Sequence, residues 1–191
     1  MSSYLEGILM KKYYNISSSL YFESVFNTYK KMNSDVVEVE VKGTLPTNGG
    51  CAVFIGNEEK VFVIYIDQMV GNAIMMSMKD APLERPQTHD LFGHVLEALG
   101  AKVQRVIIND FKDEVYFGRL ILKVENEIEE KKILEIDARS SDCIALAVKF
   151  DAPVYVAKKV LEKTDDVSEV FHRVESGDLI QKDEQDDNLI V

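Results

Sequence analysis

A change in the spacing of apolar residues constrains the fold of this 191-residue chain more than any other feature. Residues 36–42 read VVEVEVK, so valines face one side of an extended chain and charged residues face the other, as in a half-buried strand. Apolar segments at 51–56 and 60–66 follow, and each comes after turn-forming residues. The pattern predicts a three-stranded antiparallel meander over residues 36–66.

Beyond this meander the apolar spacing becomes helical. Met69, Ala73 and Met76 recur every three to four residues, and Val70 and Ile74 lie beside them in the helical pattern. This spacing predicts an amphipathic helix over 67–80 that Gly71 weakens. A methionine-rich stripe of this kind is typical of adaptable core packing.

A second helix is expected over residues 88–100. Thr88 is suited to the N-cap, because its hydroxyl can accept a hydrogen bond from a free amide of the first turn. Gly100 is suited to end the helix. The residues expected to form its buried stripe are Leu91, Phe92, Val95, Leu96 and Leu99.

The second half of the chain repeats the order of strands and then a helix. Strands are expected over 102–111, 114–125 and 132–138, followed by a helix over 140–150 and a short strand after Pro153. These elements predict an α+β fold, with a mixed but mainly antiparallel sheet and about three helices packed on it.

The distribution of charge divides the chain into three parts. Residues 1–35 carry aromatic side chains without a clean period, and we expect an N-terminal extension there. Residues 36–161 are expected to form the main domain. Residues 162–191 hold three basic residues against ten acidic ones, which predicts a poorly ordered acidic tail with a short helical piece around Val167–Val174.

Composition limits the classes of function. The formal net charge is −11, so long-range attraction cannot recruit nucleic acid, and a role in handling phosphate needs a local basic pocket or a bound cation. No apolar segment approaches the roughly 20 residues that cross a bilayer, which predicts no membrane association and a cytoplasmic protein. Cys51 and Cys143 form no C-x-x-C pair, and we expect reduced thiols.

Two expected helix starts share one arrangement of residues, in the segments 85–90 (RPQTHD) and 139–142 (RSSD). Each has an arginine before the helix, a hydroxyl residue at its start and an aspartate in its first turn. The simplest interpretation is structural, because the hydroxyl residues Thr88 and Ser140 or Ser141 can cap the free amides. Aspartates in a first turn also stabilise the helix by about 0.3–1 kcal/mol each through the helix dipole.

The alternative interpretation is that the two helix starts face one anion. Helix N-termini attract anions, and the arginine fork suits phosphate. The candidate catalytic residues are His89, Asp90 and Asp142. The candidate substrate-binding residues are Arg85, Thr88, Arg139 and Ser141. The candidate ligands for a hard cation such as Mg²⁺ are Asp90, Asp137 and Asp142.

The same two segments carry a family resemblance. RPQTHDLFGHVLEALG and IDARSSDCIALAVKFDAPVYV resemble the R-P-x-T-H-D-L and D-A-R-P-S-D-A-I-A-L-A blocks of the bifunctional nuclease domain family, and the resemblance spans roughly residues 36–160. It implies a nuclease that acts on DNA and RNA. By position, the family's blocks correspond to residues 85–90 and 137–142 of this chain.

This chain departs from the family pattern at four positions. Ser140 stands where the family has proline, and Cys143 where it has alanine. Asp67 stands where a glycine is expected, and Val70 where a glutamate is expected. The change at residue 70 bears on catalytic competence more than on the fold.

Two functions therefore remain open. The first is a metal-assisted nuclease or phosphodiesterase that acts on single-stranded DNA or RNA with Mg²⁺ or Mn²⁺. The second is a non-catalytic regulatory module, acting as a homo-oligomer, whose pocket binds a phosphate or another anion. The same arginines would serve both.

Overall fold

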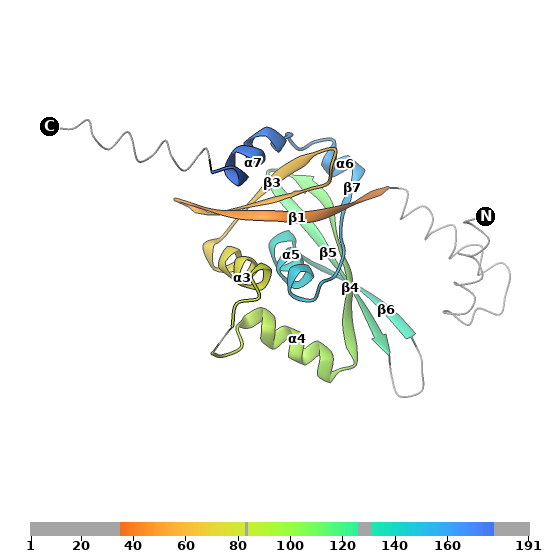
Figure 1. The fold of residues 1–191 in the computed structure, drawn as a ribbon. Helices are drawn as coiled ribbons and strands as arrows, with labels where there is room; N and C mark the ends of the chain where they lie inside the picture. The colour runs from red at the N-terminus through yellow and green to blue at the C-terminus, as the bar shows by residue number, and fades with distance from the viewer. Residues whose placement is uncertain (1–34, 83, 126–130, 178–191) are drawn as a thin grey trace, which may run out of the picture.

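The structure is a computed structural model that describes residues 35–82, 84–125 and 131–177. The described residues form a sheet with the order β3-β2-β1-β7-β4-β5-β6 (Figure 1). The strands are β1 (Val36–Thr47), β2 (Gly50–Gly56), β3 (Val61–Ile66), β4 (Ala101–Lys112), β5 (Val115–Glu125), β6 (Lys131–Arg139) and β7 (Val154–Ala157).

Two antiparallel meanders make up most of this sheet. Strands β1, β2 and β3 form the first, as the alternating segments predict, and β4, β5 and β6 form the second. The short strand β7 joins them, because it pairs antiparallel with β1 and parallel with β4. The predicted α+β fold with a mixed, mainly antiparallel sheet is therefore confirmed.

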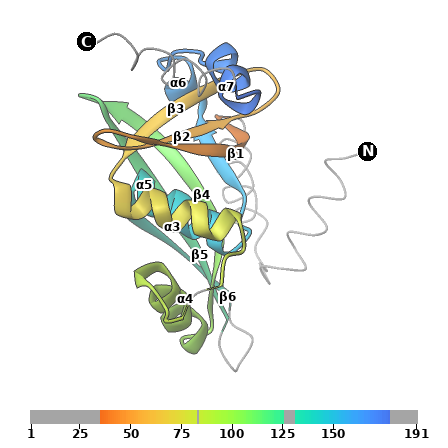
Figure 2. The ribbon, with the colours of Figure 1, turned by 60° about the vertical axis from the view of Figure 1, so that its left-hand side comes forward.

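Three helices lie on one side of the sheet, as expected. They are α3 (Gln68–Met78), α4 (Thr88–Ala98) and α5 (Ser140–Lys149). Helix α5 packs on β4, β5 and β6, and both α3 and α4 contact α5. Figures 1 and 2 show α5 next to the strands and α4 at one end of the domain. None of the described helices is long and apolar enough to span a membrane.

Helix α5 lies at the centre of the apolar core. Its residues from Cys143 to Ala147 are buried, which explains the unbroken apolar run in this part of the sequence. They pack with the buried valines and isoleucines of β2, β4 and β7. Helix α3 approaches β2 so closely that a β-carbon on Gly71 would lie 2.3 Å from Cβ of Cys51. The glycine that weakens this helix therefore permits its packing.

The burial of two helices differs from the sequence-based prediction. In α4, Leu96 is buried, whereas Leu91 and Leu99 are 60% and 69% exposed and Phe92 and Val95 are also exposed. The predicted stripe is therefore wrong except at Leu96, because α4 contacts the domain through Asp90, Gly93 and Leu96, on an adjacent face. In α3, Val70 and Ile74 are buried while Met69 is exposed.

Two further helices follow β7. Helix α6 covers Lys158–Leu161, and α7 covers Ser168–Glu175, close to the predicted helical piece around Val167–Val174. Phe171 of α7 packs on Phe54 of β2, with ring centroids 5.3 Å apart. Part of the predicted acidic tail thus packs on the meander. The predicted N-terminal extension and residues 178–191 lie outside the described residues, apart from Asp35.

Candidate functional site

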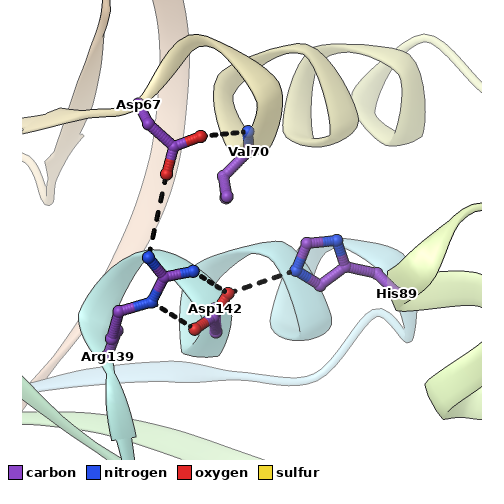
Figure 3. Close-up of polar contacts among 5 residues, drawn as sticks. All are labelled: Asp67, Val70, His89, Arg139 and Asp142. Carbon is purple, nitrogen blue, oxygen red and sulfur yellow. Dashed lines mark hydrogen bonds and ion pairs between the residues drawn. The ribbon is translucent and has the colours of Figure 1, made fainter.

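Four charged or titratable side chains from three helix starts meet on one side of α5 (Figure 3). Asp67 follows β3 and precedes α3, and His89 is the second residue of α4. Arg139 ends β6 and precedes α5, and Asp142 lies in the first turn of α5. We call Asp67, His89, Arg139 and Asp142 the four-residue cluster. Asp142 contacts two of its members, and Arg139 contacts both aspartates.

Arg139 and Asp142 form a two-point ion pair. Nε of Arg139 donates to Oδ2 of Asp142 at 2.7 Å, and Nη2 donates to Oδ1 at 3.1 Å. Burial of Asp142 raises the carboxyl pKa, but hydrogen bonds from Arg139 and His89 outweigh it, so the pKa lies below its usual value. The hydrogen bond between Arg139 and Asp142 also raises the pKa of the Arg139 guanidinium. Asp142 is therefore an ionised carboxylate whose orientation is fixed by Arg139.

His89 approaches this carboxylate from the neighbouring helix. Its Nε2 lies 3.5 Å from Oδ1 of Asp142, and its side chain is 17% exposed. The other ring nitrogen points away from Asp142 (Figure 3). A carboxylate against one ring nitrogen fixes the orientation of an imidazole. The pair therefore has the arrangement of a proton-transferring histidine with an orienting carboxylate.

Asp67 completes the cluster, and sequence reasoning did not nominate it as a site residue. Its Oδ1 accepts a hydrogen bond from the backbone N–H of Val70 at 3.0 Å, so it caps α3. Its Oδ2 lies 3.9 Å from Nη1 of Arg139. The signal in the sequence is an aspartate placed directly between a predicted strand and a predicted helix.

Asp90 lies apart from the cluster. Its carboxylate pairs with Lys149, in the last turn of α5, and accepts a hydrogen bond from the backbone N–H of Gln87 at 2.7 Å. The hydrogen bond from Lys149 is the main reason that the pKa of Asp90 lies below its usual value. Asp90 is buried, so this pair fastens α4 to α5. Lys149 was not nominated from the sequence.

A small cavity of about 80 Å³ opens between α3 and α4, beside His89. Its lining includes His89, Asp90, Gln87 and Lys149, together with residues from the second half of α3. His89 therefore lies between the Asp142 carboxylate and a small cavity whose lining includes several polar side chains.

The three carboxylates expected to bind a metal ion do not share a site. Asp137 pairs with Arg119 at 2.6 Å, Asp90 pairs with Lys149, and Asp142 pairs with Arg139. Among the described residues, no group of three or more histidine, cysteine, aspartate or glutamate side chains is placed to hold a metal ion. The residues present therefore do not fit a ready-made cation site.

The expected substrate-binding residues differ in their exposure to solvent. Arg139 is well exposed, whereas Ser141 is buried and less accessible to a ligand. Arg85 and Thr88 are exposed just before and at the start of α4. The hydrogen bonds and ion pairs of Arg139 within the described part of the chain are with Asp67 and Asp142 and do not involve Arg85. The first turns of α4 and α5 do meet, but His89 and Asp142 join them.

The helix caps also differ from the expected residues. The N-cap of α4 is Gln87 and that of α5 is Arg139, so Thr88 and Ser140 are the first helical residues. At α4 the carboxylate of Asp90 bonds the Gln87 N–H, which places the helix start one residue earlier than predicted. The predicted end is confirmed, since Gly100 adopts the left-handed conformation (φ 66°) after α4.

Comparison with known proteins identifies relatives of this chain. Residues 53–169 match the family model described as the bifunctional nuclease domain. The chain is also similar to the uncharacterized proteins MT1877 and Rv1829 of Mycobacterium tuberculosis, with 30% identity over 105 residues in each case. The matched stretch covers 55% of this chain and 59% of each relative, so it spans less than two thirds of their length. The helix starts that carry His89, Arg139 and Asp142 lie within the matched residues, and this chain belongs to the bifunctional nuclease domain family.

Proposed function

We propose that this chain hydrolyses phosphodiester bonds in single-stranded DNA or RNA at the four-residue cluster. The observation that carries the proposal is the continuous contact from Arg139 through Asp142 to His89. It places an exposed guanidinium, which suits a phosphate, beside an imidazole with an orienting carboxylate. Membership of the bifunctional nuclease domain family supports the same reaction class.

Each residue has a defined role in this proposal. Arg139 binds a non-bridging phosphoryl oxygen and stabilises the charge that develops on it. His89 accepts a proton from the attacking water as its oxygen bonds to phosphorus, and the bond to the leaving oxygen breaks. The imidazolium then returns that proton to the leaving oxygen. Asp142 is a positioning residue, because it orients His89 and Arg139.

Recruitment of a polyanion must rely on local charge. The chain carries a net charge of −11, so its overall field repels nucleic acid. Arg139 is the exposed cation within the cluster, and Arg85 and Thr88, which are exposed at the start of α4, are further candidates for phosphate contact. We expect weak binding that falls as the salt concentration rises, because only a few phosphates are contacted.

Dependence on Mg²⁺ or Mn²⁺ is part of the proposal, although the roles of Arg139, His89 and Asp142 given above do not require a metal ion. The carboxylates Asp90, Asp137 and Asp142 are each neutralised by a basic side chain. A cation would therefore have to displace an existing ion pair.

The test is cleavage of single-stranded DNA and RNA by the pure chain, with Mg²⁺, with Mn²⁺ and with a chelator. Asp142→Asn and His89→Ala should each slow cleavage by about 10²-fold or more, the usual contribution of a positioned proton-transfer group. His172→Ala serves as the matched control, because His172 is exposed on α7, away from the cluster. The proposal is wrong if the wild type cuts neither substrate or if both cluster variants cut as well as the control.

A second function is favoured by one observation, the pairing of every expected metal ligand with a basic side chain. In this alternative the chain is a regulatory module that binds a phosphate-bearing ligand at Arg139 without cleaving it. Binding to the native state must raise the melting temperature by linkage. Stabilisation by phosphate or nucleotides without any cleavage would favour this module over the nuclease.

A further inference from the structure

We infer that Asp67 makes the proposed site prefer phosphodiesters, which carry one negative charge, over phosphate monoesters, which carry two. This inference rests on the proposed function and names a residue that sets its substrate preference. It follows from the position of Asp67 next to the edge of Arg139 that remains open (Figure 3).

Asp142 already occupies one edge of the Arg139 guanidinium. Its two oxygens accept from Nε and Nη2, which leaves Nη1 as the nitrogen without a contact to Asp142. Nη1 faces Oδ2 of Asp67 at 3.9 Å, a separation longer than a hydrogen bond. The side chains of Arg139 and Asp67 are 66% and 51% exposed, so a ligand can reach the space between them.

An anion that binds Arg139 at this edge lies beside the Asp67 carboxylate. A phosphate monoester has its second pKa near 6 and is a dianion at pH 8, whereas a diester is a monoanion. At a separation of roughly 6 Å in a water-like medium, one carboxylate weakens monoanion binding about threefold. The repulsion energy doubles for a dianion, so the loss of affinity is squared, to about tenfold.

Asp67→Asn isolates this electrostatic effect. Asparagine is as good an N-cap as aspartate, so the hydrogen bond from Val70 N–H and the start of α3 are retained. Asp113→Asn is the matched control, since it removes the same charge from the β4–β5 turn. Asparagine tolerates the left-handed conformation of Asp113 (φ 50°). Asp67→Glu keeps the charge and should keep the wild-type preference.

The experiment measures the Kd of methyl phosphate and dimethyl phosphate by ³¹P NMR titration at pH 8, with the melting temperature of each variant as a check of folding. These probes differ by one methyl group and one charge. Asp67→Asn should lower the Kd of dimethyl phosphate about threefold and the Kd of methyl phosphate about tenfold. Asp113→Asn should change neither Kd.

The outcomes separate the two claims. If Arg139→Ala abolishes binding but Asp67→Asn leaves the ratio of the two Kd values unchanged, Asp67 does not set the preference and the proposed site stands. If neither the wild type nor Asp67→Asn binds either probe, both the inference and the proposed function are wrong.

Discussion

Nε2 of His89 and Oδ1 of Asp142 lie 3.5 Å apart, although they belong to the first turns of different helices. Asp142 also binds Arg139 through two hydrogen bonds, so one carboxylate orients both an imidazole and a guanidinium. Helices α4 and α5 must keep their mutual position for this contact to persist. Lys149 and Asp90 fasten the same two helices at the other end of α5.

The first prediction concerns the two faces of α4. Leu96→Ala should lower the free energy of unfolding by about 2–5 kcal/mol, because it removes a buried side chain. Leu99→Ala should change it by no more than about 0.5 kcal/mol, because Leu99 is mostly exposed. The two substitutions are chemically identical and lie in or next to the same helix. Urea denaturation measures both, and equal losses would contradict the observed burial.

The second prediction concerns the close approach of α3 to β2. Alanine has a helix propensity about 1 kcal/mol better than glycine, so Gly71→Ala would stabilise an isolated helix. In this fold the added β-carbon would lie 2.3 Å from Cβ and 2.7 Å from Sγ of Cys51. We therefore expect a net loss of about 1–3 kcal/mol from overpacking.

Thermal denaturation of Gly71→Ala measures this loss. Gly49→Ala is its control, because no atom lies within 4 Å of the β-carbon that it would add. A rise in the melting temperature of Gly71→Ala would show that helix propensity outweighs the contact with Cys51.

The third prediction concerns the two thiols. Burial is the main cause that raises the pKa of Cys143 to about 12, and the nearby carboxylates of Asp142 and Asp137 add to it. Cys51 is also buried, and its pKa is raised by burial. The native chain should therefore resist iodoacetamide at pH 8, and both thiols should react once urea unfolds it.

Mass spectrometry after timed exposure to iodoacetamide measures this protection. Gln68→Cys supplies an exposed thiol on α3 as a positive control. Labelling of Cys143 in the native chain at the rate of that control would contradict its burial.

The fourth prediction concerns acid stability. The pKa of Asp90 is lowered in the folded chain, chiefly by Lys149, so the folded chain binds a proton there more weakly than the unfolded chain does. The pair thus adds stability above the ordinary carboxyl pKa of 3.8, and this contribution is lost as the pH falls through the lower folded pKa. Asp90→Asn should lower the melting temperature at pH 7, and the deficit should shrink below pH 4.

Melting temperatures from pH 7 to pH 3 measure that deficit. Glu58→Gln, at an exposed position in the β2–β3 turn, provides a matched change of carboxylate to amide. A deficit for Asp90→Asn that stays constant over this range would contradict a stabilising pair with Lys149.

Much of the fold follows from local spacing in the sequence. Alternation of apolar residues and the intervening turns place β4, predicted over 102–111 and found at Ala101–Lys112. The position of β7 between β1 and β4 could not be predicted, because a four-residue strand carries no sign of its partners. The buried face of α4 was also missed, since an apolar stripe does not reveal which neighbours will cover it.

The sequence predicted several residues of the candidate site, but it did not predict which of them contact one another. The arginine and aspartate of the α5 start and the histidine of the α4 start come together as one site, but Asp90 does not join them. Successive residues of a helix point about 100° apart, so His89 and Asp90 cannot both face Asp142. Asp90 turns instead to Lys149, which sequence spacing alone does not link to it.

The most direct test of the central claim is a double-mutant cycle on the rate of single-stranded RNA cleavage. It compares the wild type with His89→Ala, Asp142→Asn and the double variant. If Asp142 acts by orienting His89, the double variant should be no slower than the slower single variant, because the two residues work as one unit. Multiplicative losses in the double variant, or full activity in either single variant, would contradict the account.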